Sequence, residues 1–220
     1  MMMKTMQSID VAITTGDVEL QGILHIPDSA NGIVVFAHGS GSSRFSTRNQ
    51  RVAEALNNAG LATLLFDLLT AKEHERDLDT AEYRFDIALL THRLIGAVDW
   101  LALHAPTKTL SVGLFGASTG AAAALQAAAE LEGQISAVVS RGVRPDLAGS
   151  DALSRVEVPT LLLVGGLDDV VIDLNRQAAS QMHCHQELVI IPGATHLFEE
   201  PGTLEEVERI SAQWFAKYLK

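Results

Sequence analysis

The sequence has a single cysteine, Cys184, among its 220 residues. One cysteine excludes an internal disulfide and agrees with a reducing compartment, so we expect a cytoplasmic protein. The chain also lacks any apolar run near the roughly 18 residues that a membrane-spanning helix needs. No secretory signal is expected, because polar residues interrupt the start of the chain before any apolar block appears. A membrane is therefore not an expected partner.

Basic residues are scarce as well. The chain has 16 Lys and Arg against 27 Asp and Glu, which gives a formal net charge of −11, and no long basic cluster occurs. Proteins that bind nucleic acid draw much of their affinity from Lys and Arg contacts with phosphates. Nucleic acid is therefore not an expected partner either.

Motifs for cofactors and metals are also missing. The glycine-containing segments 39–41 and 116–120 lack the lysine of a phosphate loop and the full spacing of a dinucleotide site. The tract His183, Cys184 and His185 has metal-binding residue types. Three consecutive side chains cannot readily converge on one tetrahedral ion, and no partner motif stands out. We expect neither a cofactor nor a metal ion.

What the chain does have is a hydrophobic content of 47% and a regular alternation of strand-like and helix-like segments from residue 32 onward. This alternation predicts an α/β fold with a doubly wound, mostly parallel, eight-stranded sheet in a single domain, residues 1–220. Six strands are expected at 32–37, 61–66, just before Gly116, 135–140, 159–164 and 187–191, and an antiparallel hairpin at 7–14 and 18–25. Helices are expected at 49–59, 81–104, after Gly120, and at 173–182 and 203–219. The polar segment 70–80 is expected to be a solvated loop or a cap fragment, too short for a large lid.

The most informative stretch runs from residue 112 to 126, VGLFGASTGAAAALQ. Its pattern predicts a buried strand, then a tight turn that carries Ser118, and then a helix that begins directly after the turn. The pattern Gly-x-Ser-x-Gly between strand and helix is that of a nucleophile elbow. Gly116 and Gly120 have no Cβ, so the serine can adopt strained backbone geometry while strand and helix pack closely.

Two further reactive residues follow later strands of the expected sheet. Asp168 comes after the strand at 159–164, and His196 follows the strand at 187–191. The chain order Ser, Asp, His is the order of the catalytic triad in α/β-hydrolases. A serine hydroxyl needs an imidazole to take its proton, and the imidazole needs a carboxylate to orient it. The adjacent Asp169 is the alternative carboxylate.

The segment His38-Gly39-Ser40-Gly41-Ser42 follows the expected strand at 32–37. Such a segment is either an ordinary turn rich in glycine and serine or the loop that supplies an oxyanion hole. In the second case His38 orients the loop rather than acting as a base. His38 and Gly39 are then candidates for contact with the substrate.

These motifs together resemble the small, lidless members of the dienelactone hydrolase type within the α/β-hydrolases. The resemblance rests on GASTG at 116–120, GGLDDVV at 165–171 and GATHLFEEPG at 193–202. It favours Asp168 over Asp169, and it implies that the oxyanion hole uses the backbone N–H groups of Ser40 and Thr119. In one respect the chain departs from dienelactone hydrolases themselves, whose nucleophile is a cysteine. Serine at position 118 shifts the expected substrate toward general esters.

Four arginines lie in expected loops near the same edge of the sheet: Arg44, Arg48, Arg141 and Arg144. They either bind a substrate carboxylate or pair with the many carboxylates of the protein itself. Arg44 and Arg141 are the substrate-binding candidates.

The resulting hypothesis is a serine hydrolase that cleaves small carboxylic esters, lactones or thioesters through an acyl-enzyme. An acyltransferase, a peptidase or a perhydrolase would use the same triad, and a non-catalytic binding protein would share the fold. The sequence leaves the oligomeric state open.

Overall fold

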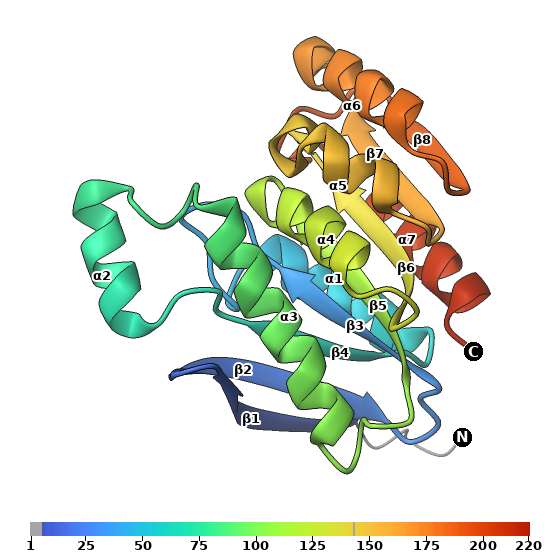
Figure 1. Ribbon diagram of the computed structural model, residues 1–220. Coiled ribbons are helices and arrows are strands. Elements are labelled where there is room, and N and C mark those ends of the chain that lie inside the picture. Colours follow the sequence, from blue (N-terminus) through green and yellow to red (C-terminus); the bar gives the residue numbers. More distant parts are fainter. Residues whose placement is uncertain (1–5, 143) are drawn as a thin grey trace.

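The computed structural model describes residues 6–142 and 144–220, and its centre is an eight-stranded sheet in the order β1-β2-β4-β3-β5-β6-β7-β8 (Figure 1). The hairpin is antiparallel and β2 also pairs antiparallel with β4, while every pairing from β4 to β8 is parallel. The strands are β1 (Met6–Thr15), β2 (Val18–Pro27), β3 (Gly32–Ala37), β4 (Ala62–Phe66), β5 (Ser111–Ala117), β6 (Ile135–Arg141), β7 (Thr160–Gly165) and β8 (Gln186–Ile191). The predicted fold class is confirmed.

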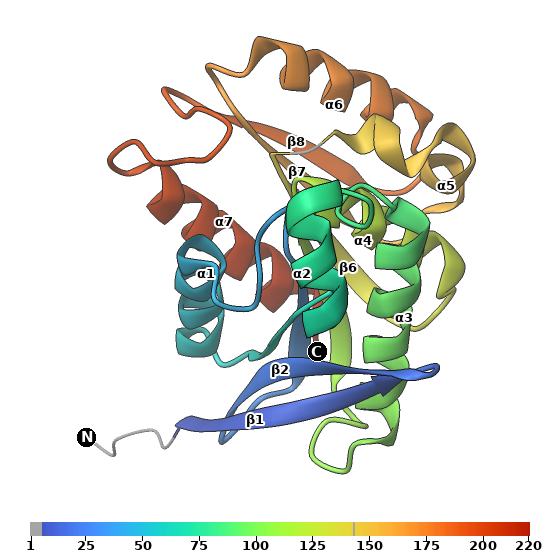
Figure 2. The same cartoon turned by 90° about the vertical axis from the view of Figure 1, so that its left-hand side faces the viewer.

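Helices cover both faces of the sheet. One face carries α1 (Thr47–Asn58) and α7 (Thr203–Tyr218), and the other carries α3 (Ile87–Leu103), α4 (Thr119–Glu130), α5 (Ser150–Arg155) and α6 (Asp169–Gln181) (Figures 1 and 2). Each face has its own apolar cluster, and the central strands contribute to both because their residues are buried on both sides. Within the described residues, no helix has the length and apolarity that a membrane crossing demands.

The polar segment after β4 differs from the expectation of a loop. Residues Ala71–Thr80 form α2, which stands apart from the sheet (Figure 1). A capping box starts it: the Thr70 hydroxyl accepts the N–H of Glu73, and the Glu73 carboxylate accepts the N–H of Thr70. Because α2 has hardly any buried face, its sequence shows no apolar stripe, which is the signal that would have revealed a helix.

Two helix starts and the crossover after β6 also differ from expectation. The helix predicted over 81–104 begins only at Ile87, because Ala81 ends α2 in the left-handed region (φ 53°) and Asp86 caps α3 by accepting the N–H of Leu89. Helix α6 begins at Asp169, four residues before the predicted 173. The crossover after β6 contains a 3-10 turn, Pro145–Ala148, and α5, neither of which was expected, and its Val143 lies outside the described residues.

The packing of β5 against α4 depends on two glycines. A Cβ on Gly116 would lie 2.3 Å from the Cα of Ala121, and a Cβ on Gly120 would lie 2.2 Å from the carbonyl oxygen of Ala37. Both distances are far below van der Waals contact, and both neighbouring atoms belong to the backbone, which cannot swing away. The elbow therefore requires glycine at both positions.

We expect Gly120→Ala to lower the free energy of unfolding by about 3 kcal/mol or more, since the new methyl group meets fixed backbone. The matched control is Gly133→Ala, at a glycine with φ 74° and no atom within 4 Å of the added Cβ. That control incurs only left-handed strain, about 1 kcal/mol. Urea denaturation of both variants measures the difference, and equal losses would contradict the steric account of the elbow.

Candidate active site

Ser118 occupies the turn between β5 and α4 with a backbone conformation that side-chain-bearing residues rarely adopt, φ 52° and ψ −123°. Two hydrogen bonds hold it there: its N–H donates to the Arg141 carbonyl over 3.1 Å, and its own carbonyl accepts the N–H of Ala121 over 3.0 Å. Strained backbone of this kind persists only where the surrounding structure enforces it, and it occurs often at functional sites. The turn places the Ser118 side chain at the carboxyl edge of the parallel sheet.

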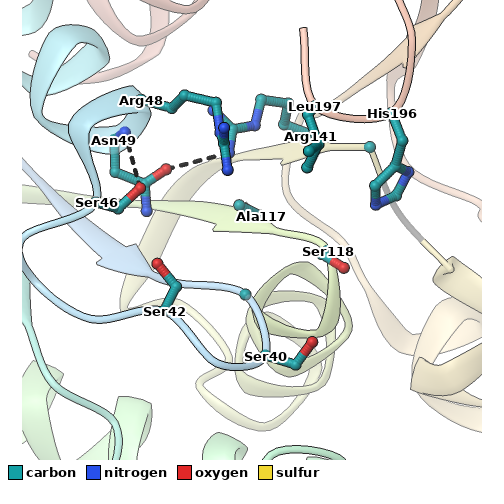
Figure 3. A pocket seen from close by; sticks show the side chains of 12 residues that line it. Ser40, Ser42, Ser46, Arg48, Asn49, Ala117, Ser118, Arg141, His196 and Leu197 are labelled. Carbon is teal, nitrogen blue, oxygen red and sulfur yellow. Dashed lines mark hydrogen bonds between the residues drawn. The ribbon is translucent and has the colours of Figure 1, made fainter. Parts of the chain in front are cut away.

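His196 and Asp168 meet at the same edge, from the loops that follow β8 and β7. The Nδ1 atom of His196 lies 2.9 Å from Oδ2 of Asp168. A carboxylate accepts hydrogen bonds, so Nδ1 carries the proton and Nε2 is left as an acceptor. In Figure 3 the ring of His196 points toward the Ser118 hydroxyl. Asp169, the alternative carboxylate, is exposed and begins α6.

A cavity of about 220 Å³ lies beside Ser118 and His196 (Figure 3). Its wall is formed by Gly39, Ser40, Ser42, Ser46, Arg48, Asn49, Ala117, Ser118, Arg141, Gly142, His196 and Leu197. Apart from Ala117 and Leu197, the side chains that line it are polar or charged. The cavity therefore suits a small substrate that carries polar groups.

The loop that follows β3 passes directly over the serine. A Cβ on Gly39 would lie 3.2 Å from the Cβ of Ser118, so the backbone of this loop approaches Ser118 closely. Ser40 lines the cavity, and Thr119 begins α4 immediately after Ser118. Ser40 and Thr119 also border one common smaller pocket beside the cavity. The two residues expected to supply backbone N–H groups thus lie on adjoining walls.

His38 fixes the start of that loop. Its Nε2 accepts the N–H of Leu68 over 3.0 Å, so its Nδ1 carries the proton and donates to the carbonyl of Gly39 over 2.9 Å. Burial holds the pKa of His38 below its usual value. The ring is 7% exposed and neutral, with both nitrogens engaged. It does not line the cavity of Ser118, and its contacts are those of a residue that orients the loop.

The four arginines have different partners, and two of them line the cavity of Ser118. Arg44 pairs with Asp67 and lines a different pocket, and Arg144 pairs with Asp146 at the surface. Arg48 lines the cavity of Ser118 and pairs with Glu199 over 2.9 Å. Arg141 lines the same cavity and donates from Nη2 to Oδ1 of Asn49 over 3.3 Å.

The sequence reasoning missed three polar residues of the cavity wall, Ser42, Ser46 and Asn49, as possible contacts for a substrate. Ser46 is the N-cap of α1, and its hydroxyl accepts the N–H of Asn49 over 3.4 Å. A serine three residues ahead of an expected helix is a recognisable N-cap signal. That signal could have placed the start of α1 at the cavity.

Nothing in the described residues forms a metal centre: no group of three or more His, Cys, Asp or Glu side chains there could hold an ion. In the tract at 183–185, the ring of His185 stacks against Trp214 with centroids 5.8 Å apart. Burial raises the pKa of the Cys184 thiol, which disfavours the reactive thiolate.

The buried, neutral state of His38 predicts how stability varies with pH. Its pKa lies below the unfolded value of about 6.5, so the unfolded chain binds a proton that the native protein does not. The free energy of unfolding is therefore not reduced by His38 above a pH of about 6.5. As the pH falls from about 6.5 to the native pKa of His38, the free energy of unfolding decreases by up to about 1.4 kcal/mol per pH unit. Chemical denaturation of the wild type and of His38→Gln from pH 7.5 to 5 measures the slope. An unchanged slope in the variant would contradict the assignment.

Known proteins of similar sequence and structure identify the family of this chain. The sequence matches the profile of the dienelactone hydrolase family over residues 20–218. A dienelactone hydrolase from Anabaena variabilis is 56% identical and superposes with a TM-score of 0.96, covering 98% of this chain and 99% of that one. Est1E from Butyrivibrio proteoclasticus shares the fold, with a TM-score of 0.79 at 16% identity, covering 94% of this chain and 98% of its own.

Among curated relatives, a Mycobacterium tuberculosis protein named "Putative phosphoribosyl transferase" is 54% identical over 210 residues. The match covers 96% of this chain but 46% of that protein, so the chain spans about half the length of the curated relatives it matches. The family profile, by contrast, covers most of the chain. The chain therefore belongs to the dienelactone hydrolase family and has the α/β-hydrolase fold.

Proposed function

We propose that the protein is a serine hydrolase that cleaves small carboxylic esters, lactones or thioesters through an acyl-enzyme. Ser118 is the nucleophile, His196 the general base and acid, and Asp168 the residue that orients His196. The observation that carries this proposal is the 2.9 Å contact between His196 and Asp168, together with the strained Ser118 that lines the same cavity as His196. Nucleophile, base and orienting group are the three roles that acyl transfer requires.

The reaction follows from this geometry. The Ser118 hydroxyl adds to the substrate carbonyl carbon while its proton passes to Nε2 of His196, and the backbone N–H groups of Ser40 and Thr119 stabilise the oxyanion. The intermediate collapses, the leaving alcohol takes the proton from His196, and an acyl-enzyme remains. Water then attacks this ester, again with His196 as base, and the acid is released.

The cavity sets the range of substrates. A volume of about 220 Å³, lined mostly by polar side chains together with Ala117 and Leu197, favours small acyl and alcohol groups over long acyl chains. An acyltransferase, a peptidase or a perhydrolase would use the same residues with another acceptor or leaving group. Phosphoribosyl transfer is named for relatives that are about twice as long as the matched region.

Ser118→Ala tests the proposal directly. Removing the nucleophile should lower kcat for a short p-nitrophenyl ester by about 10⁴-fold to 10⁶-fold, because the remaining groups stabilise the transition state only weakly. A fluorophosphonate probe should label the wild type at Ser118 and leave the variant unlabelled. An unlabelled wild type without ester turnover would refute the serine hydrolase assignment.

A matched pair of variants tests whether Asp168 or Asp169 orients His196. Asp168→Asn keeps the shape but turns the acceptor into an amide that cannot hold the His196 tautomer, so kcat should fall by about 10⁴-fold. The neighbouring Asp169→Asn alters an exposed residue of the same charge at the start of α6. It should retain activity within about threefold, because the effect of that charge on the helix terminus is under about 1 kcal/mol. Steady-state kinetics on one ester compare the two, and a larger loss in the Asp169 variant would reverse the assignment.

A further inference from the structure

Arg141 is the buried charge of the cavity. It ends β6, it is 8% exposed, and within the described residues no ion pair joins it to a carboxylate. Its Nη2 donates to Asn49, but its Nη1 is buried with no hydrogen-bond partner among those residues. A buried donor left in this state costs about 1 to 3 kcal/mol, and more when it is charged. The Nη1 group of Arg141 therefore lacks a hydrogen-bond acceptor among the described residues.

Packing against two aromatic rings accounts for the position of the Arg141 side chain but supplies no hydrogen-bond acceptor for Nη1. Arg141 lies over the rings of Phe115 and Phe198, with its guanidinium carbon 5.7 and 6.0 Å from their centroids. Aromatic faces attract a cation and help it tolerate burial. They do not accept the in-plane N–H groups as a carboxylate or a phosphate does.

A second arginine adds positive charge at the same place. Burial, together with the charge of Arg48, lowers the pKa of Arg141 to about 10. The two guanidinium groups lie next to each other on the cavity wall in Figure 3. The partner of Arg48, Glu199, is itself largely exposed, so this ion pair is worth little and does not neutralise the interior.

The third element is the N-terminus of α1. Ser46 caps this helix of 12 residues, Arg48 and Asn49 lie in its first turn, and all three line the cavity. The first turn contains no acidic residue. The N–H groups at such a terminus carry a partial positive charge and bind anions, phosphate in particular. Helix terminus and buried guanidinium thus converge on one corner of the cavity.

We propose that this corner, formed by Ser46, Arg48, Asn49 and Arg141, binds a phosphate group carried by the substrate. The inference rests on the proposed function and narrows it to phosphorylated esters or lactones. Ser118 attacks the carboxylic carbonyl, and the phosphate serves as a recognition group at which no bond changes.

Phosphate fits this corner better than a carboxylate does. A carboxylate is planar and is satisfied by one guanidinium fork. Here donors come from different directions: two guanidinium groups, the first turn of a helix and the hydroxyl of Ser42 on the same wall. A tetrahedral group with three terminal oxygens can accept from all of these directions at once.

The first experiment measures binding without catalysis. Calorimetry in phosphate-free buffer titrates inorganic phosphate into Ser118→Ala, which removes hydrolysis. We expect saturable binding that weakens by about tenfold or more when Arg141→Met is added, the loss expected for charge-assisted hydrogen bonds. Arg48→Gln, at a more exposed site, gives a smaller loss and serves as the second variant if Arg141→Met fails to fold. Arg144→Gln is the matched control, because Arg144 pairs with Asp146 outside the cavity, and its binding should match that of Ser118→Ala alone.

The second experiment compares p-nitrophenyl esters of equal chain length that end in a methyl, a carboxylate or a phosphonate group. The phosphonate ester should have the highest kcat/KM, and its advantage over the methyl ester should shrink about tenfold in Arg141→Met. Absence of phosphate binding, binding unchanged in both arginine variants, or preference for the carboxylate ester would each overturn the proposal. Phosphate binding through Arg141 without hydrolysis of any ester would sustain this site and refute the hydrolase reaction. Ester hydrolysis without phosphate binding would support the hydrolase reaction and refute the phosphate site.

Discussion

The close approach of β5 to α4 is the constraint on which the site depends. The Ser118 turn can be this tight only because Gly116 and Gly120 leave no Cβ between strand, helix and the end of β3. The strain at Ser118 is offset by hydrogen bonds to neighbouring backbone and by the largely buried α4. One steric condition thus fixes both the position of Ser118 at the edge of the sheet and the packing of the central helix.

The remaining active-site groups follow from the direction of the strands. In a parallel sheet every strand ends at the same edge, so loops distant in sequence converge there. Asp168 follows β7 and His196 follows β8, neighbours in the sheet that bring the two side chains to 2.9 Å. The loop after β3 covers Ser118 because β3 pairs with β5. Pairing between strands, rather than proximity in sequence, assembles the site.

The sequence predicted the parts that carry strong local signals. The elbow, the buried strands and the order of Ser118, Asp168 and His196 depend on residue type and spacing, and the sheet was predicted with its class and its number of strands. Helix α2 was missed because nearly all its side chains are solvated, so no periodic apolar signal exists. Arg44 pairs with Asp67, whereas Arg141 pairs with no carboxylate of the described residues. The sequence could not predict this difference, because it depends on contacts between segments that are distant in the chain.

Reaction chemistry and substrate choice have separate structural origins in this protein. Ser118, Asp168, His196 and the loop that begins at His38 come from the carboxyl edges of β5, β7, β8 and β3, where sterics and strand order leave little freedom. The charged corner comes from α1 and the end of β6, and its side chains can change without disturbing the elbow. In the function proposed above, the type of reaction therefore follows from the sheet. In the proposed anion site, the substrate depends on which group satisfies the buried guanidinium of Arg141, because an unmatched buried charge favours an anion as its partner.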